Sequence, residues 1–558
     1  MSIKNYFALL SLAILLSFFA CKDSTPTPID LADFIDPFIG TGGHGHTFPG
    51  ATMPFGMVQL SPDTRLEGWD GCGGYHFTDS IVYGFSHTHL SGTGVSDYGD
   101  ILLMPTTGEL RLNNGADGTA GYRSRFEKNK EVASAGYYQT YLEDHGVGVE
   151  LTASPRAGMH RYTFENKATE GNVIVDLKHR DQVLNGKLHV ISDTELAGVR
   201  ISNAWAKEQH LYFVIKFSEA FAKDKISIDA DSLVYGFKFD LSKEKKLSAK
   251  VGISAVSIEG ARKNLSAEMP AWDFAKHQQQ AKTAWSIAMN KIEVSGGSEA
   301  QQTIFYTAMY HAMIAPNLYQ DIDGQYRGMD LKVHQAEDHT NYTIFSLWDT
   351  YRGTHPLYTL IETERTNDFI KTFLKQFEAG GILPIWELSA NYTGCMIGYH
   401  SIPVIADAYQ KGIRGFDAKQ ALAAMQVSAE ENHLGLDSYK KWGYIPSNEE
   451  AESVSKTLEY AYDDWCIAMM AKSMGEGKIY KKYLKRAQSY KNIFDPTTGF
   501  MRAKLNNGFV ANFNPAEVNF HYTEANSWQY SFYAPQDIKG FYTLMGGKDN
   551  LEQKLDQL

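Results

Sequence analysis

The stretch MPAWDFAKHQQQAKTAWSIAMNKIEV, residues 269–294, marks the point where the pattern of the sequence changes from strands to helices. Its apolar residues recur at a spacing that places them on roughly one face of a helix: Trp272, Ala275, Ala281, Trp285 and Met289. A chain of 558 residues is too long for one ordinary core. The sequence therefore predicts a first domain over 33–268 and a second over 269–558.

Residues 33–268 have the pattern of strands. Short β-branched and aromatic runs with partial two-residue alternation are separated by Gly, Asn and Asp. These runs are GVGVEL (146–151), HRYTF (160–164), NVIVDL (172–177), HLYFVIKF (210–217) and VGISAVS (251–257). No long helix is expected between them, so the sequence predicts an antiparallel β-sandwich.

Residues 269–558 read as helices that come in pairs joined by loops. Nine are expected, near 270–292, 299–313, 346–361, 365–378, 397–411, 417–430, 449–473, 479–492 and 525–545. Ser447 and Glu450 have the spacing of a capping box before the seventh. Since an (α/α)6 toroid needs twelve helices, we expect a toroid that is incomplete at the C-terminus.

The N-terminus carries an export signal. Residues 1–20 contain an apolar run too short to span a bilayer comfortably, which ends at Cys21 and is followed by a polar linker over 21–32. This pattern is typical of a bacterial lipoprotein lipidated on Cys21, and the alternative is an ordinary secretory signal. The protein is therefore expected to be exported, either lipid-anchored to the envelope or periplasmic, with no other membrane contact.

Composition excludes one class of partner and leaves another open. The net charge of -12 and the absence of a Lys/Arg stripe argue against nucleic acid. The chain holds 32 Tyr, 30 Phe and 9 Trp, many beside polar residues, which suits either a core or the faces on which sugar rings stack. The three remaining cysteines, Cys72, Cys395 and Cys466, lack metal-like spacing.

Two histidine pairs lie in glycine-rich loops. His44 and His46 form one HxH pair, and His87 and His89 form the other. Together they could supply four imidazoles to zinc, although the helical second half lacks the alternating units that would bring acidic ligands. The alternative is that they are hydrogen-bonding histidines of the loops.

Two short stretches of the chain could contact a sugar. In WDGCGGYH (69–76), Trp69 can stack on a pyranose while Asp70 and Cys72 lie among glycines; the alternative is a buried tryptophan at a strand end. In FSLWDTYRGTHPL (345–357), Asp349 and Arg352 share one helix face, where they could grip vicinal hydroxyls or form a structural ion pair.

A third candidate region, 383–409, places polar groups in an apolar frame. Trp386, Glu387 and His400 are its candidate substrate-binding residues, and each could instead belong to the core. If the helical hairpins form a ring, the loops at one end converge, and carboxylates distant in sequence meet there. That layout suits glycoside hydrolysis, which needs an acid and a base.

Glu524 is the candidate acid. It is a lone carboxylate among the rings of HYTEANSWQYSFYAPQD (521–537), so it is either a solvated residue at a helix start or an acid whose pKa is raised. Aromatic neighbours that desolvate its anion and other pocket carboxylates that repel it would produce the second, and the stretch alone leaves both alternatives open.

Five separated stretches resemble glycoside hydrolase family 92, the bacterial exo-acting α-mannosidases, from about residue 33 to the last residue. They are GTGGHGHTFPGATMPFGMVQLSPDT (40–64), GFSHTHLSGTGVSDYGDILLMP (84–105), SLWDTYRGTHPL (346–357), MIGYHSIPVIADAYQKGI (396–413) and TEANSWQYSFYAPQD (523–537). The resemblance implies a β-sandwich followed by an (α/α)6 barrel, with the active site between them.

The resemblance also implies a function. It points to inverting, calcium-dependent hydrolysis of terminal α-linked mannose on N-glycans or mannans, with Glu524 as general acid. Asp349 and Arg352 would line the pocket for the terminal mannose, while Trp69, Asp70 and Cys72 would reach in from the sandwich. The calcium ligands are not assigned, and linkage preference and oligomeric state are not predicted.

One departure from the family matters. Its catalytic base belongs to a later GNDD-type motif, which does not occur before Leu558 and is expected beyond it. The chain as given is therefore predicted to have little or no turnover. Two alternatives remain: a surface glycan-binding lipoprotein without catalysis, and a glycan-processing amidase that uses zinc.

Overall fold

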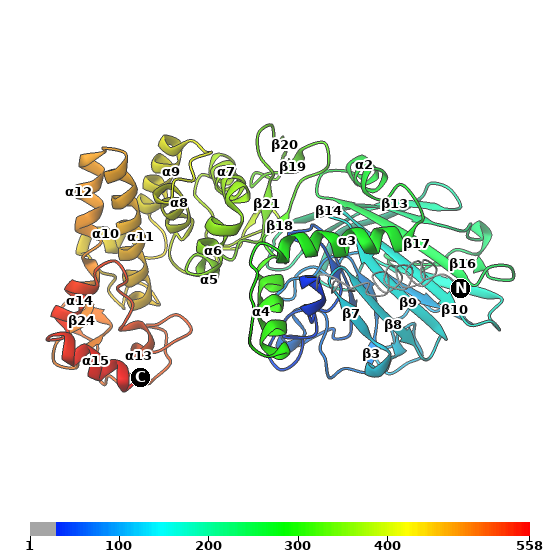
Figure 1. Cartoon of the computed structure of the whole chain (residues 1–558), viewed down its shortest axis with the longest axis horizontal. Coiled ribbons are helices and arrows are strands. Elements are labelled where there is room, and N and C mark those ends of the chain that lie inside the picture. The colour runs from blue at the N-terminus through cyan, green and yellow to red at the C-terminus, as the bar shows by residue number, and fades with distance from the viewer. Residues whose placement is uncertain (1–29) are drawn as a thin grey trace, which may run out of the picture.

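The computed structural model describes residues 30–558, in which a β-sandwich is followed by a helical domain (Figure 1). The predicted export signal over 1–20 and Cys21 lie outside the described residues. The predicted order of sandwich and helices is thus confirmed.

Two antiparallel sheets, neither closed into a barrel, form the sandwich. The first has seven strands in the order β1 (Ala51–Thr52), β2 (Gln59–Asp63), β4 (Gly84–Ser86), β5 (Leu102–Thr106), β11 (Glu170–Asp176), β16 (Val234–Asp240), β15 (Ser227–Ile228). The second has eight in the order β12 (Gln182–Val190), β13 (Glu195–Asn203), β14 (Gln209–Phe217), β17 (Lys246–Ser254), β10 (Ala157–Phe164), β9 (Val147–Ala153), β8 (Tyr137–Leu142), β7 (Val132–Ser134). A further short pair, β3 (Ile81–Val82) and β6 (Ser124–Arg125), lies beside them. All five strand runs predicted from sequence fall on strands of these sheets.

Three helices connect the sandwich to the rest of the chain. α2 (Ile258–Glu268), which follows the last of the predicted strand runs and was not expected from the sequence, packs on β17 and β14. Its N-cap is Ser257, whose side chain accepts from the Gly260 amide. α3 (Phe274–Met289) begins at the cap Asp273 and packs on β9, and α4 (Glu299–Ala312) follows with a complete capping box.

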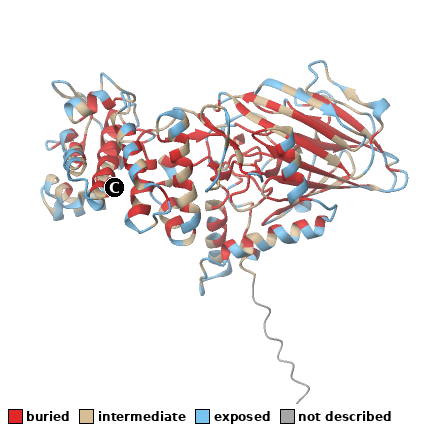
Figure 2. Cartoon of the chain, turned by 90° about the horizontal axis from the view of Figure 1, so that it is seen from above, coloured by how far each residue is buried: buried red, intermediate tan, exposed pale blue. Residues whose placement is uncertain are grey.

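The junction between the two domains is buried (Figure 2). Trp285 of α3 is fully buried, and its indole Nε1 donates to the Thr52 carbonyl oxygen at 2.8 Å. Phe55 contacts the rings of Tyr358 and Phe369 in the helical domain. One continuous hydrophobic core runs through both domains, so the sandwich and the helices hold each other in place.

The remaining helices form an open arc that leads away from the sandwich (Figure 1). They are α5 (Leu347–Thr350), α6 (Thr354–Ile361), α7 (Thr363–Gly380), α8 (Ser401–Gln410), α9 (Ala418–Glu430), α10 (Leu436–Trp442), α11 (Ser453–Ser473), α12 (Gly477–Arg486), α13 (Ser527–Tyr530), α14 (Ile538–Leu544) and α15 (Lys548–Asp556). α11 is the central helix, since it contacts α8, α9 and α12. Within residues 30–558 no helix is both long and apolar enough to cross a bilayer.

Some local predictions are wrong. α11 begins after Glu452, which lacks a side-chain cap, and the Ser447 amide instead donates to the Lys504 carbonyl oxygen, so the capping box over Ser447 and Glu450 is not formed. The helices α10 and α15 were not expected. Neither were the short hairpins β24 (Phe494–Asp495) with β25 (Phe500–Met501) and β26 (Lys504–Leu505) with β27 (Gly508–Phe509).

Candidate active site

A cleft of about 510 Å³ lies where the sandwich loops meet the helical domain. From the sandwich it is lined by His44, Gly45, His46, Trp69, Gly92, Thr93, Gly94, Val95 and Trp205. From the helical domain it is lined by Ser346, Trp348, Asp349, Trp386, Cys395, Met396 and Glu524. Trp69, Asp349, Trp386 and Glu524, four of the predicted site residues, therefore share one cleft.

The sandwich wall of the cleft is aromatic. Trp69 is 58% exposed, which removes the alternative of a buried strand-end tryptophan. Its ring packs edge-on against His46 at 4.2 Å between centroids and lies near His44. Asp70, which was predicted to contact substrate, accepts a hydrogen bond from His44 Nδ1 at 2.6 Å, and this bond is the main cause of its lowered pKa. Trp69 thus presents an open face to the cleft.

The helical wall carries the two carboxylates of the cleft lining. Asp349, on α5, accepts a hydrogen bond from Ser346 Oγ at 2.5 Å. Glu524 precedes α13 and is held between two anchors: the Thr523 amide donates to Ser455 Oγ of α11, and Asn526 caps α13. No ion pair links Asp349 to Arg352 in the described chain; the Arg352 guanidinium instead packs on the Tyr351 and Trp348 rings.

Glu524 has the electrostatics expected of an acid. Its side chain is exposed to the cleft, and its pKa is raised by partial burial and then by the negative charges of Asp349 and Glu452. This is the direction predicted from the sequence. A shift in this direction favours the carboxylic acid form relative to an ordinary glutamate, and proton donation requires that form.

The backbone of the cleft is held in unusual conformations. Four of its lining residues have positive φ although none is glycine: His46 at 51°, Ser346 at 47°, Met396 at 64° and Glu524 at 49°. Each such residue costs on the order of 1–3 kcal/mol unless its surroundings impose it. These four lie on both walls, so strain is concentrated where the walls face each other.

Behind the helical wall lies a buried charged cluster. His400, the residue before α8, donates from Nε2 to Glu459 at 2.7 Å and from Nδ1 to Asp463 at 2.9 Å. Burial opposes a charged imidazole, but the two carboxylates outweigh it and raise the pKa of His400 to about 9. Glu459 also accepts from the indole Nε1 of Trp348, which lines the cleft. The cluster therefore fixes one cleft residue without entering the cleft.

The other predicted site residues lie outside the cleft lining. Glu387 is buried and accepts from the Thr343 hydroxyl and the Ala390 amide; burial raises its pKa to about 7. Cys72 is also buried, which raises the pKa of its thiol. The site residues predicted from the sequence thus include some that line the cleft and others that lie behind its lining.

Three of the four paired histidines of the glycine-rich loops are hydrogen-bonded to backbone, whereas His44 is bonded to Asp70. Nδ1 of His46 contacts the Thr93 carbonyl oxygen, that of His87 the Ile101 oxygen, and that of His89 the Gln59 oxygen. Within residues 30–558 no three His, Cys, Asp or Glu side chains are grouped to hold a metal. Calcium takes roughly six to eight oxygen ligands. The carboxylates of Asp349 and Glu524 alone do not supply them, so no step below is assigned to a metal.

Several cleft residues were not singled out from the sequence. Trp348 directly precedes Asp349 in the stretch 345–357. Its place beside a predicted site residue could have indicated it. Trp205 packs on Trp386 with ring centroids 4.5 Å apart, yet it lies in a loop without any motif. Only the fold brings these two tryptophans, 181 positions apart in the sequence, into contact where the two walls of the cleft meet.

Comparison with known proteins agrees with this architecture. Residues 34–254 match the glycosyl hydrolase family 92 N-terminal domain, and residues 260–558 match the family's catalytic domain. A solved family GH92 α-mannosidase from Bacteroides thetaiotaomicron is 37% identical with a TM-score of 0.89; the match covers 95% of this chain and 74% of that one. The same enzyme has been solved in complex with mannoimidazole.

Two further relatives extend the comparison. A family GH92 inverting mannosidase from Bacteroides thetaiotaomicron VPI-5482 is 28% identical with a TM-score of 0.87, over 95% of this chain and 74% of that one. An uncharacterized secreted glycosidase of Arthroderma benhamiae is 27% identical over 633 aligned residues, covering 99% of this chain and 76% of the relative. With both family domains matched along nearly the whole described chain, the protein belongs to glycosyl hydrolase family 92.

Proposed function

We propose that the protein is an exported exo-α-mannosidase that removes terminal α-linked mannose from N-glycans or mannans. The observation that carries this proposal is the arrangement of Glu524 and Trp69 on one cleft, with the pKa of Glu524 raised. The solved relatives named as α-mannosidases, one in complex with mannoimidazole, support the choice of sugar.

The cleft residues have distinct roles in this proposal. Trp69 offers its exposed ring to one face of the terminal sugar, and Asp349 accepts hydrogen bonds from sugar hydroxyls. Glu524 donates its proton to the glycosidic oxygen as the bond to the anomeric carbon breaks. An inverting mechanism then requires a base to take a proton from the attacking water on the opposite face of the ring.

The described cleft lining contains no separate candidate for the catalytic base. Of the two carboxylates in its lining, Glu524 serves as the acid and Asp349 as a substrate ligand. An inverting pair stands roughly 6.5–9.5 Å apart with water between. We therefore propose that the 558-residue chain binds mannosides but turns them over slowly.

That two-carboxylate lining also favours a second candidate function, binding of mannose-containing glycans without catalysis. We further propose export with a lipid anchor on Cys21; the secreted relative from Arthroderma benhamiae supports export.

Mannose release from an α-linked mannobiose, with and without a calcium chelator, tests the proposal. Slow release is expected; its loss with the chelator and its recovery with added calcium would support the calcium dependence that the resemblance to the family implies. Release that is indifferent to the chelator would overturn calcium dependence. Binding of methyl α-mannoside with no release at all would support the binding protein instead, and the absence of both would refute the assignment to mannose.

A further inference from the structure

A buried arginine of the sandwich connects the loops that form the aromatic wall of the cleft. Arg180 lies in the turn between β11 and β12 and is 6% exposed. Its guanidinium donates from one terminal nitrogen to the carbonyl oxygens of Arg65 and Gly71, each at 2.7 Å. From the other terminal nitrogen it donates to the oxygens of Cys72 at 3.2 Å and Ser96 at 3.4 Å.

These four carbonyls belong to two of the sandwich loops that line the cleft, three to one loop and that of Ser96 to the other. The first loop, residues 64–72, includes Trp69, and the second, residues 92–96, includes Gly94 and Val95. The loops also touch directly: a Cβ placed on Gly94 would lie 3.0 Å from the indole Nε1 of Trp69. Arg180 therefore sets the spacing of two surfaces that are already packed against each other.

The chemistry of the contact is unusual for a buried cation. Within residues 30–558 Arg180 makes no ion pair with a carboxylate, and all its partners are backbone oxygens. Burying a charge without a counter-charge is costly, so its retention needs a reason. A guanidinium presents donors in a fixed planar fork, whereas lysine offers a point charge with three mobile donors. The arrangement suits a group that must hold several carbonyls at fixed positions.

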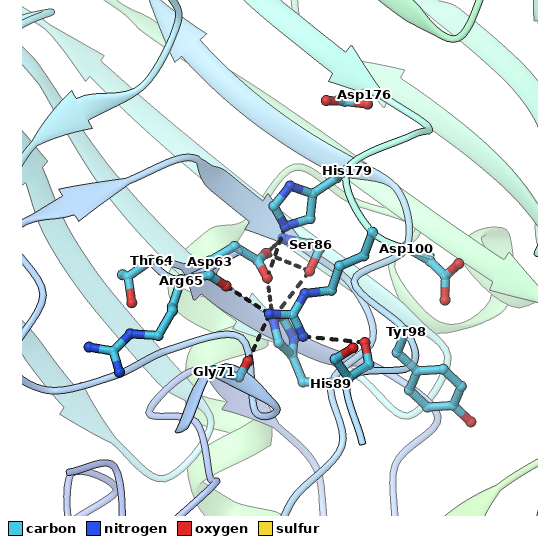
Figure 3. Close-up of polar contacts among 12 residues, drawn as sticks. Asp63, Thr64, Arg65, Gly71, Ser86, His89, Tyr98, Asp100, Asp176 and His179 are labelled. Atoms are coloured by element: carbon cyan, nitrogen blue, oxygen red, sulfur yellow. Dashed lines mark hydrogen bonds and ion pairs between the residues drawn. The ribbon is translucent and has the colours of Figure 1, made fainter. Parts of the chain in front are cut away.

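Arg180 is itself held from behind. The Arg200 side chain donates to the Arg180 carbonyl oxygen and pairs with Asp100. Gly99, at φ 71°, leaves room for the Arg180 chain, because a Cβ there would meet Cδ at 2.9 Å. Asp63 fixes the N-terminal end of the loop 64–72. It accepts a hydrogen bond from the Ser86 hydroxyl at 2.6 Å and contacts His89 and His179 (Figure 3).

We infer that Arg180 is a positioning residue of the cleft: by joining the loops 64–72 and 92–96 it places the Trp69 ring where a terminal sugar can stack on it. Only the second half of this inference, that the Trp69 ring is placed for a sugar, rests on the proposed function. The first half, that Arg180 orders both loops, is independent of any sugar.

Hydrogen exchange and sugar binding test the two halves separately. In Arg180→Met, amides of 64–72 and 92–96 are expected to exchange at least about tenfold faster, and the Kd for methyl α-mannoside to rise about tenfold. Arg180→Lys should show smaller increases in both loop exchange and Kd. If Arg180→Met does not fold, the same two measurements on Arg180→Lys test the inference. Loop exchange like that of the wild type in a folded variant would overturn the inference.

A matched control separates positioning from general stability. Arg156 is a buried sandwich arginine, 9% exposed, that pairs with Glu268 at 2.7 Å and does not line the cleft. Arg156→Met is expected to lower the melting temperature while leaving loop exchange and sugar affinity unchanged. If the wild type binds no methyl α-mannoside, the proposed function fails, and the exchange result still confirms or refutes the loop-ordering role. If both arginine variants weaken sugar binding equally, Arg180 has only a general structural role.

Discussion

The two walls of the cleft are built on different physical principles. The sandwich wall is a set of loops with an exposed tryptophan, ordered by backbone hydrogen bonds to a buried arginine. The helical wall presents two carboxylates and is backed by the buried cluster of His400, Glu459 and Asp463. One wall supplies a fixed surface and the other supplies charge, so perturbations of each should have separable effects on binding and on chemistry.

The largest effect is expected at the charged wall. Glu524→Gln removes the proton donor and should slow hydrolysis of unactivated mannosides by about 10²–10⁴-fold, with a smaller loss on activated aryl mannosides, whose leaving groups need no proton. Single-turnover rates on both substrates, relative to the wild type, measure this. Glu517→Gln, in the same loop but outside the cleft lining, is the control. Equal losses on the two substrates would contradict the acid role.

The cluster behind that wall should matter next, through stability. Glu459→Gln leaves His400 with one charged partner and weakens the bond that holds Trp348. We expect the free energy of unfolding to fall by about 3 kcal/mol in a denaturant titration. Glu430→Gln, which removes a half-exposed partner of Arg486 and Lys482, should cost less than about 1 kcal/mol. Similar losses in the two variants would show that the cluster is no more than a surface ion pair.

The same cluster predicts a dependence of stability on pH. The folded pKa of His400, about 9, lies above its ordinary value of 6.5, so its stabilisation is complete below pH 6.5 and is lost as pH rises through about 9. The loss should reach at most about 3 kcal/mol. Melting temperatures between pH 6 and 10 measure it, with His400→Gln as the reference. A wild-type decline no steeper than that of the variant would refute the charged state of His400.

The smallest effect is expected at the sandwich wall. Gly94→Ala places a methyl group 3.0 Å from Trp69 Nε1 and should shift the ring, which weakens methyl α-mannoside binding by about 1 kcal/mol. Gly42→Ala is the control, since its new methyl would meet Phe77 at an ordinary 3.6 Å. Calorimetric titration of both variants gives the comparison. If Gly94→Ala binds methyl α-mannoside with unchanged affinity, the Trp69 ring does not contribute to sugar binding as proposed.

The sequence predicted the elements that follow a regular period. The alternating runs that became β9, β10 and β14 and the helical face around Trp285 were recognised because one side of each is buried. α2 escaped notice because it follows β17 after three residues and is mostly polar. The hairpins between 494 and 509 are too short for any period to be visible.

The site divides in the same way. Glu524, Trp69, Asp349 and Trp386 lie in recognisable stretches and meet in the cleft. The bond between Trp348 and Glu459 joins residues 111 positions apart, and the bond between Arg180 and Gly71 joins residues 109 apart. Such contacts are made by side chains whose neighbours are set by tertiary packing, so no local pattern could indicate them.

The left-handed residues of the cleft carry a consequence for protein engineering. At His46, Ser346, Met396 and Glu524 a glycine would adopt the observed backbone without steric conflict, although it would also gain freedom in the unfolded chain. Selection for thermal stability alone would therefore favour glycine at these positions. Such substitutions would loosen the backbone that places Glu524 across the cleft from the Trp69 ring. A library that leaves these four positions unchanged and varies the outer strand β12 would search for stabilising substitutions outside the cleft lining.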